Sequence, residues 1–154
     1  MFNIISFSSE NIVPKNFGYE KLYELTKVKG KIVSVKTTTE SEQYKGKKLL
    51  VIVENYEYDE GSIRVVADKK KACYLIDLSK IINSYGTRRA VEIAKLRSFL
   101  KVCNRFGAFY AFADFSRDEF ELRRASELKH ISLLLGINEG QAKFALGMLN
   151  EYLE

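Results

Sequence analysis

Short apolar runs separated by polar segments predict a chain in which strands and helices follow one another. Apolar runs flanked by polar residues predict strands over 2–7, 31–35, 49–53, 72–78 and 108–113. The runs at 49–53 (LLVIV) and 72–78 (ACYLIDL) are continuous rather than alternating, as is typical of strands covered on both faces. The pattern therefore favours a mostly parallel sheet of about five strands with helices packed across it.

The segments between the strands carry apolar residues at helical spacing. We expect helices over 17–27, 62–71 and 87–106, the last capped by Thr87 and ended by Gly107. Residues 36–48 show no apolar periodicity, so they are predicted to form a loop or an exposed edge.

The C-terminal stretch from Ala108 to Glu154 reads as a buried strand, a charged turn and two helices. The first helix is expected to begin near Arg123 and to bury four residues at 3/4 spacing: Leu128, Ile131, Leu134 and Leu135. Gly136 follows it, where a left-handed residue closes a helix at low cost. Asn138 is placed to cap the second helix.

Length and composition are those of one soluble domain spanning residues 1–154. The chain is 46% hydrophobic and 29% charged, and its apolar runs are far shorter than the roughly 18 residues of a membrane span. The N-terminus lacks the basic and long apolar regions of a signal peptide. Cys73 and Cys103 lie in apolar segments and are predicted to be core thiols. These features lead us to expect a cytoplasmic protein without a membrane partner.

Several kinds of chemistry have no support in the sequence. His130 is the single histidine and lies mid-helix, so a zinc site built from paired histidines or a cysteine cluster is excluded. The chain has no GxSxG, P-loop or GxGxxG motif, which removes support for acyl transfer, nucleotide hydrolysis and dinucleotide binding. We therefore predict no catalytic residue and no bound metal.

Two carboxylates near strand ends leave one alternative open. Asp77 and Asp114 lie at the ends of predicted strands, where sites gather in barrel-like folds. A Mg²⁺ site formed by the two would suit a phosphoesterase. The favoured interpretation is that they cap turns or form ion pairs with Arg117 or Arg123.

Cations are the strongest functional signal. The net charge is +5, and Arg97, Lys101 and Arg105 form a row of one sign, spaced i, i+4, i+8, away from the apolar face of their helix. The alternative to phosphate binding is that these cations merely form a solvated helix face. Two further clusters favour phosphate binding: Lys69 to Lys71 before a strand, and Arg117 with Arg123 and Arg124 before a helix. The candidate phosphate-binding residues are Lys69, Lys70, Lys71, Arg88, Lys95, Arg97, Lys101, Arg105, Arg117, Arg123 and Arg124.

Several segments match, in order, the motifs of one protein family. They are Leu96-Arg97-Ser98, Phe109 to Asp114, Leu122-Arg123, Glu127-Leu128, Leu134-Leu135-Gly136-Ile137 and Gln141-Ala142-Lys143. These segments resemble protein component 3 of archaeal and eukaryotic ribonuclease P. In that family an Arg-rich helix leads to a buried strand, then to a Leu-Arg-Ser-Pro-x-Asp-Leu motif, a Leu-Leu-Gly turn and a helix with an Ala-Lys step. Ala125 stands where the motif has proline, and the chain is shorter between Leu78 and Thr87.

The resemblance implies a TIM-barrel-like α/β fold related to PHP phosphoesterases but without their metal histidines. At 154 residues we expect a reduced or incomplete barrel, since a full one needs about 250 residues. It also implies a subunit that binds ribonuclease P RNA and protein component 2 and supports removal of the 5′ leader from precursor tRNA. Other protein subunits would share that particle, and Mg²⁺ would serve its RNA. A metal-dependent phosphoesterase and a pure protein-interaction module remain the alternatives.

Overall fold

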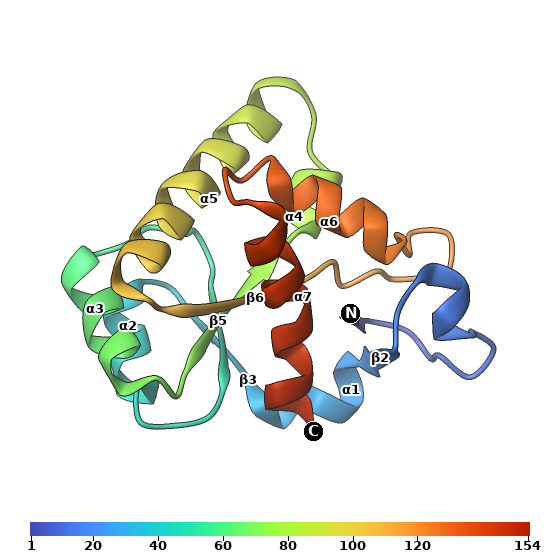
Figure 1. Cartoon of the computed structure of the whole chain (residues 1–154), viewed down its shortest axis with the longest axis horizontal. Helices are drawn as coiled ribbons and strands as arrows, with labels where there is room; N and C mark the ends of the chain where they lie inside the picture. The colour runs from blue at the N-terminus through green and yellow to red at the C-terminus, as the bar shows by residue number, and fades with distance from the viewer.

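Six short parallel strands form the framework of the computed structural model, which describes residues 1–154 (Figure 1). They are β1 (Phe2–Ile5), β2 (Lys21–Glu24), β3 (Ile32–Val35), β4 (Leu50–Val53), β5 (Cys73–Asp77) and β6 (Phe109–Ala113). One sheet has the order β3-β4-β5-β6, and β1 pairs with β2 in a second sheet. A single parallel bridge from Ile5 to Ser116 places β1 beside the chain leaving β6.

Helices connect the strands and cover the two faces of the sheet. They are α1 (Leu25–Val28), α2 (Thr38–Ser41), α3 (Glu60–Lys69), α4 (Ser79–Ile82), α5 (Gly86–Phe106), α6 (Ala125–Leu133) and α7 (Glu139–Leu153). Three 3₁₀ turns lie at Pro14–Phe17, Lys29–Lys31 and Glu42–Tyr44. No helix combines the length and apolar character needed to span a membrane.

The alternation of side chains along each strand explains why both faces are covered. In β5, Tyr74 and Ile76 join a core with residues of α3 and α5, whereas Cys73 and Leu75 join a second core with the C-terminal half of α7. The continuous apolar run of β5 is therefore explained by burial of both faces of the strand, as the sequence predicted.

Helix α7 packs closely against β6 and reaches both ends of the strand array. Ala111 and Ala113 of β6 are fully buried in the core formed with α7, and their small size lets the helix approach the sheet. At one end, the Tyr23 hydroxyl of β2 donates to Asn150 Oδ1 at 2.7 Å. At the other end, Lys31, which precedes β3, donates from Nζ to the Leu153 carbonyl at 3.0 Å.

These contacts mean that the strands curve around α7. Strands β2 and β3 are not hydrogen-bonded to each other, so the strands form an open array with two edges. The structure is thus an α/β fold with parallel sheets and flanking helices, and no closed barrel is seen.

Four local predictions were wrong. Residues 17–27 are not one helix, because Leu22 and Tyr23 pair with Asn3 and Ile4 of β1 and bury their side chains, which raises the strand count to six. Residues 36–48 contain α2 and a 3₁₀ turn, with Thr37 accepting a hydrogen bond from the Glu40 amide.

The other two errors concern helix ends. Helix α5 begins at Gly86, and Tyr85 rather than Thr87 occupies the extended position before it. Leu134 is exposed because α6 ends at Leu133, after which helical spacing no longer applies. The closing glycines were predicted correctly: Gly107 and Gly136 have φ values of 71° and 78°.

Candidate nucleic-acid interface

A polar groove lies between α5 and the turn that joins α6 to α7. Arg97 and Lys101 supply its positive charge, and the groove has a volume of about 540 Å³. Its other lining residues are Ser98, Asn104, Leu135, Gly136, Ile137 and Gln141. Neither Arg97 nor Lys101 forms an ion pair within the chain. Two unpaired cations among amide and hydroxyl donors make a surface suited to phosphate oxygens.

The groove depends on a glycine in the joining turn. Gly136 has φ 78°, a conformation that residues with a side chain rarely adopt, and a Cβ there would lie 3.4 Å from Arg97 Nε. The guanidinium can therefore lie across the turn. Asn138 then accepts a hydrogen bond from the Gln141 amide at 2.8 Å and so begins α7 beside the groove. The positive end of the α7 dipole adds to the field of the two cations.

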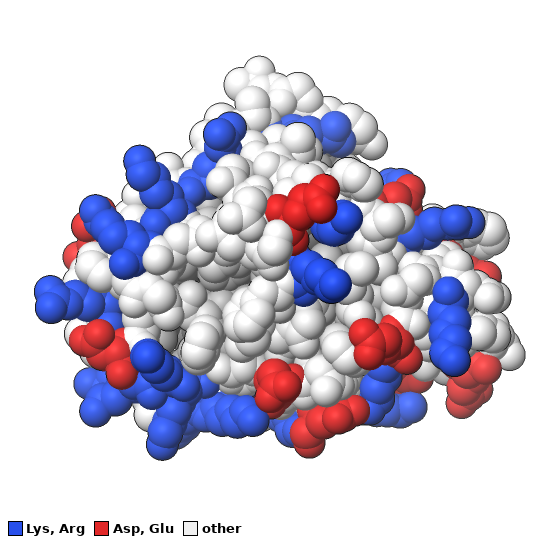
Figure 2. Space-filling model, viewed as in Figure 1, with Lys and Arg blue, Asp and Glu red and all other residues white.

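The other predicted phosphate-binding residues of α5 lie near carboxylates and outside the groove of Arg97 and Lys101. Arg105 forms an ion pair with Glu60 of α3, so its charge is already compensated. Arg88 and Lys95 lie on the opposite flank of the helix and line a second groove, of about 360 Å³, which also holds Glu54 and Glu92. Figure 2 shows Lys and Arg side chains spread along α5 and around the corner near α3. Arg97, Lys101 and Arg105 all lie on α5, as the spacing predicted. Of these three cations, only Arg105 is paired with a carboxylate within the chain.

Lys69, Lys70 and Lys71 form a separate exposed cluster at the end of α3. Lys70 ends the helix with φ 49°, and Lys71 immediately precedes Ala72 and β5. The Lys71 carbonyl accepts a hydrogen bond from the Tyr152 hydroxyl at 2.7 Å. Strand direction places this cluster at the amino ends of the strands. It does not share the groove of Arg97 and Lys101.

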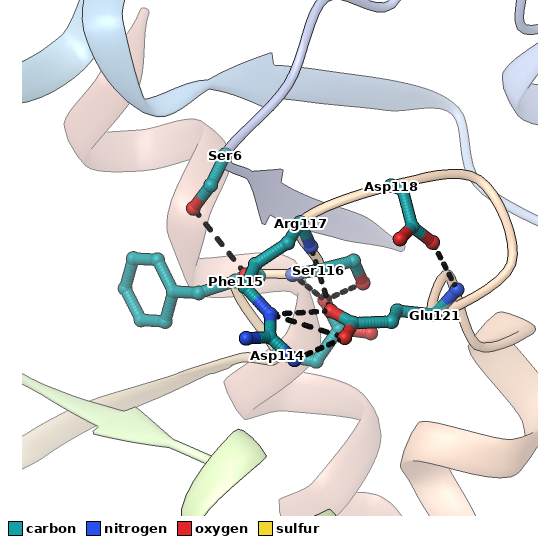
Figure 3. Close-up of polar contacts among 7 residues, drawn as sticks. All are labelled: Ser6, Asp114, Phe115, Ser116, Arg117, Asp118 and Glu121. Carbon is teal, nitrogen blue, oxygen red and sulfur yellow. Dashed lines mark hydrogen bonds and ion pairs between the residues drawn. The ribbon is translucent and has the colours of Figure 1, made fainter.

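The predicted arginine cluster after β6 does not act as one unit. Arg117 and Glu121 form an ion pair at 2.5 Å (Figure 3). The Arg124 amide donates to Glu127 Oε2 at 2.7 Å, which begins α6. Arg123 instead lines a small cavity with Asp114. None of the three lines the groove beside α5.

A buried carboxylate, Asp114, binds Ser116 in the turn after β6 (Figure 3) and also binds Asn3 of β1. Asp114 is 3% exposed, and its Oδ1 accepts from the Ser116 hydroxyl at 2.7 Å, the Ser116 amide at 3.1 Å and Asn3 Nδ2 at 2.8 Å. Its Oδ2 is buried and has no hydrogen-bond partner. Burial raises the pKa of Asp114, although the hydrogen bonds from Ser116 and Asn3 oppose this shift.

Asp77 is the second carboxylate considered for a metal. Its Oδ1 accepts from the Ser79 amide at 2.9 Å, which forms a tight turn between β5 and α4, and burial raises its pKa. No group of three or more His, Cys, Asp or Glu side chains is arranged to hold a metal ion. The hydrogen bonds to Ser79 and Ser116 place each aspartate in the turn that follows its strand, which is one of the two roles favoured from the sequence. The predicted alternative partners Arg117 and Arg123 form no ion pair with either of them.

Replacing Asp114 by asparagine is expected to leave stability unchanged or to raise it at neutral pH. Because burial raises the pKa of Asp114 in the folded chain, its contribution to stability is greatest below the unfolded Asp pKa of about 4. It then falls as the pH rises through the folded-state value. Asp114→Asn does not titrate, so its unfolding midpoint relative to the parent chain is expected to increase as the pH is raised.

Asp114→Ala provides the comparison. It removes the acceptor of three hydrogen bonds and leaves buried donors on Asn3 and Ser116, a loss expected to cost about 1–3 kcal/mol. Thermal unfolding of both variants across the acid-to-neutral range distinguishes the two effects. An Asp114→Asn variant as unstable as Asp114→Ala at neutral pH would contradict the assignment.

Sequence reasoning missed three polar residues of the groove: Ser98, Asn104 and Gln141. Ser98 and Asn104 are close to Arg97 and Lys101 on the same helix, so helical spacing could have predicted that they lie beside these cations. Gln141 comes from another helix, and nothing in the sequence around it indicated that it lies beside Arg97 and Lys101.

His130 is exposed, with Nδ1 2.7 Å from the Ser126 carbonyl, which matches the predicted helical histidine. Both cysteines are buried, as predicted.

Comparison with known proteins finds a structural likeness but no sequence match. No protein-family model matches the chain. No curated protein matches its sequence. A chain in the cryo-EM structure of archaeal ribonuclease P with mature tRNA has a similar structure, with a TM-score of 0.68 and 12% identity. The similarity covers 99% of this chain and 79% of that chain. At this identity the likeness shows a shared fold.

Proposed function

We propose that this chain is a protein subunit of ribonuclease P, of the component 3 type, that binds RNA and supports removal of the 5′ leader from precursor tRNA. In this role the RNA carries the catalytic chemistry, and the protein binds and positions RNA. The observation that carries the proposal is the groove in which Arg97 and Lys101 lie without a counterion inside the chain.

Two independent lines support the proposal. The first is the fold, which is shared across 99% of this chain with a chain of archaeal ribonuclease P. The second is the position of the motif segments that resemble component 3. Leu96-Arg97-Ser98 lies on α5, Leu135-Gly136-Ile137 forms the joining turn, and Gln141 lies in the first turn of α7. These three segments line the same groove. The fold also suits a reduced relative of the TIM-barrel-like PHP proteins.

The proposed partners follow from the same role. They are ribonuclease P RNA, precursor tRNA, protein component 2 and the remaining protein subunits, with Mg²⁺ serving the RNA. The cytoplasm is the proposed location. The exposed cations outside the groove, such as Lys69 to Lys71, are candidates for a second contact with RNA or with a partner protein.

Reconstitution tests the proposal directly. We expect the isolated chain to leave precursor tRNA intact, and we expect its addition to ribonuclease P RNA and the other subunits to increase the rate of 5′-leader cleavage. The measurement is the single-turnover rate with and without the chain, at several salt concentrations, because phosphate contacts weaken as salt rises. An equal rate with and without the chain would overturn the proposed role.

The phosphoesterase alternative rests on the unpartnered Oδ2 of Asp114. It requires metal-dependent turnover of a phosphate ester by the isolated chain, and loss of that turnover in Asp114→Asn. The interaction-module alternative requires that the chain retain a protein partner after RNA is digested and bind no RNA itself. Assaying the purified chain with Mg²⁺ and a generic phosphodiester, and pulling down with and without nuclease, separates the three functions.

A further inference from the structure

The outward face of α7 carries an exposed aromatic side chain. Phe144 is 60% exposed, although most large apolar side chains of the chain are buried. Shallow hollows lie on both sides of it. One, of about 460 Å³, extends from Phe144 over Gly140 to Phe109 at the start of β6. The other, of about 430 Å³, extends over Gly147 and Met148 towards Glu151. An exposed ring beside hollows of this size has the shape of a docking surface.

Gly147 gives this face a second unusual property. A glycine inside a helix costs about 1 kcal/mol relative to alanine. Apart from the neighbouring residues and backbone of α7 itself, no atom lies within 4 Å of the position that a Cβ would occupy at Gly147. Packing within the chain therefore does not require glycine here, and its absence of a side chain deepens the hollow beside Phe144.

The charges on this face are arranged symmetrically about Gly147. Lys143 lies one turn before Gly147 and Glu151 one turn after it, so all three share one side of the helix. Both charged side chains are exposed, and neither forms an ion pair within the chain. A face with opposite charges at equal distances from its centre is complementary to itself when it is turned through 180°.

We propose that the outward face of α7 binds a second copy of this chain, with the two α7 helices antiparallel across a twofold axis near Gly147. In this arrangement Lys143 of each copy faces Glu151 of the other. Each Phe144 ring enters the hollow beside Gly147 of the other copy. A parallel arrangement would place like charges opposite each other, so the charges select the antiparallel one. The contact centres on one aromatic side chain per copy, and we expect a dissociation constant on the order of 10–100 μM.

The docking surface adjoins the proposed RNA-binding groove, because Asn104 and Gln141 line both the groove and the hollow that extends from Phe144 to Phe109. Phe144 and Gly147 do not line the groove that holds Arg97 and Lys101. Self-association therefore goes beyond the proposed function and does not depend on it. A chain that fails to dimerise can still bind RNA, and a chain that fails to bind RNA can still dimerise.

Charge reversal tests the geometry of the proposed dimer. Sedimentation equilibrium of the full chain at low salt is expected to show a mass that rises with concentration from 17.7 kDa towards twice that value. Lys143→Glu alone and Glu151→Lys alone are each expected to weaken the dimer about tenfold, because each places like charges opposite one another at two positions. An equimolar mixture of the two variants is expected to restore association, since one supplies both carboxylates and the other both ammonium groups.

Two further variants complete the experiment. Phe144→Ser is expected to abolish association while leaving the thermal unfolding midpoint nearly unchanged, because the ring is largely exposed. Lys15→Glu, which reverses an exposed charge far from α7 in sequence and outside this face, is the matched control and is expected to dimerise normally. A parent chain that stays monomeric throughout overturns the proposal. Charge-reversal variants that weaken association but do not recover on mixing also overturn it.

Discussion

Replacing both Arg97 and Lys101 by alanine is expected to weaken RNA binding on the order of 10- to 100-fold at low salt. Both side chains line the groove and lack a counterion within the chain, so their charges are available to phosphate groups. Loss of two phosphate contacts is also expected to reduce the slope of log affinity against log salt by about 1.4 to 1.8. Titration of a labelled ribonuclease P RNA at several salt concentrations measures both quantities.

Arg105→Ala is the matched control, because it removes a cation from the same helix. Its guanidinium is already paired with Glu60, so we expect a much smaller loss of affinity. Arg97 and Lys101 lie outside the buried face of α5, and the double variant is therefore expected to unfold within about 0.5 kcal/mol of the parent chain. Unchanged RNA affinity in a folded double variant would exclude the groove as the binding surface.

Phe99→Ala is expected to have the largest effect on stability, about 3–5 kcal/mol. Phe99 is fully buried on the inner face of α5 and makes edge-to-face contacts with Tyr56, Tyr58 and Tyr74 at centroid distances of 5.6, 6.2 and 5.2 Å. Alanine would leave a cavity among three rings that are held by different parts of the chain. A domain of this size is typically stable by only about 5–15 kcal/mol, so the variant loses much of its margin.

Urea unfolding followed by circular dichroism measures this loss. Val91→Ala is the control, because Val91 lies on the same helix and is 46% exposed. We expect it to change the free energy of unfolding by less than about 0.5 kcal/mol. A Phe99→Ala variant that loses less than about 1 kcal/mol would show that the aromatic cluster is not the core that anchors α5.

The sequence alone determined the features that depend on local spacing. Continuous apolar runs correctly indicated the strands that became β4, β5 and β6, because a strand covered on both faces has no polar positions. Helical spacing correctly placed Arg97 and Lys101 away from the apolar face of α5, which the structure shows to include Leu96, Phe99, Leu100 and Cys103. Gly136 and Asn138 correctly marked the turn before α7. Each of these patterns is complete within about a dozen neighbouring residues.

Only the tertiary structure decided which charges remain available and which segments pair. Tyr19, Leu22 and Leu25 fit helical spacing, yet Leu22 lies in β2 because β1 offers hydrogen bonds and a buried face. Arg105 and Glu60 are far apart in sequence, and the packing of α3 against α5 brings them together. Asp114 reads as an ordinary strand end until Asn3, 111 positions away, becomes its hydrogen-bond donor. Local spacing specifies which side of an element is apolar, whereas partner choice depends on contacts that only the folded chain creates.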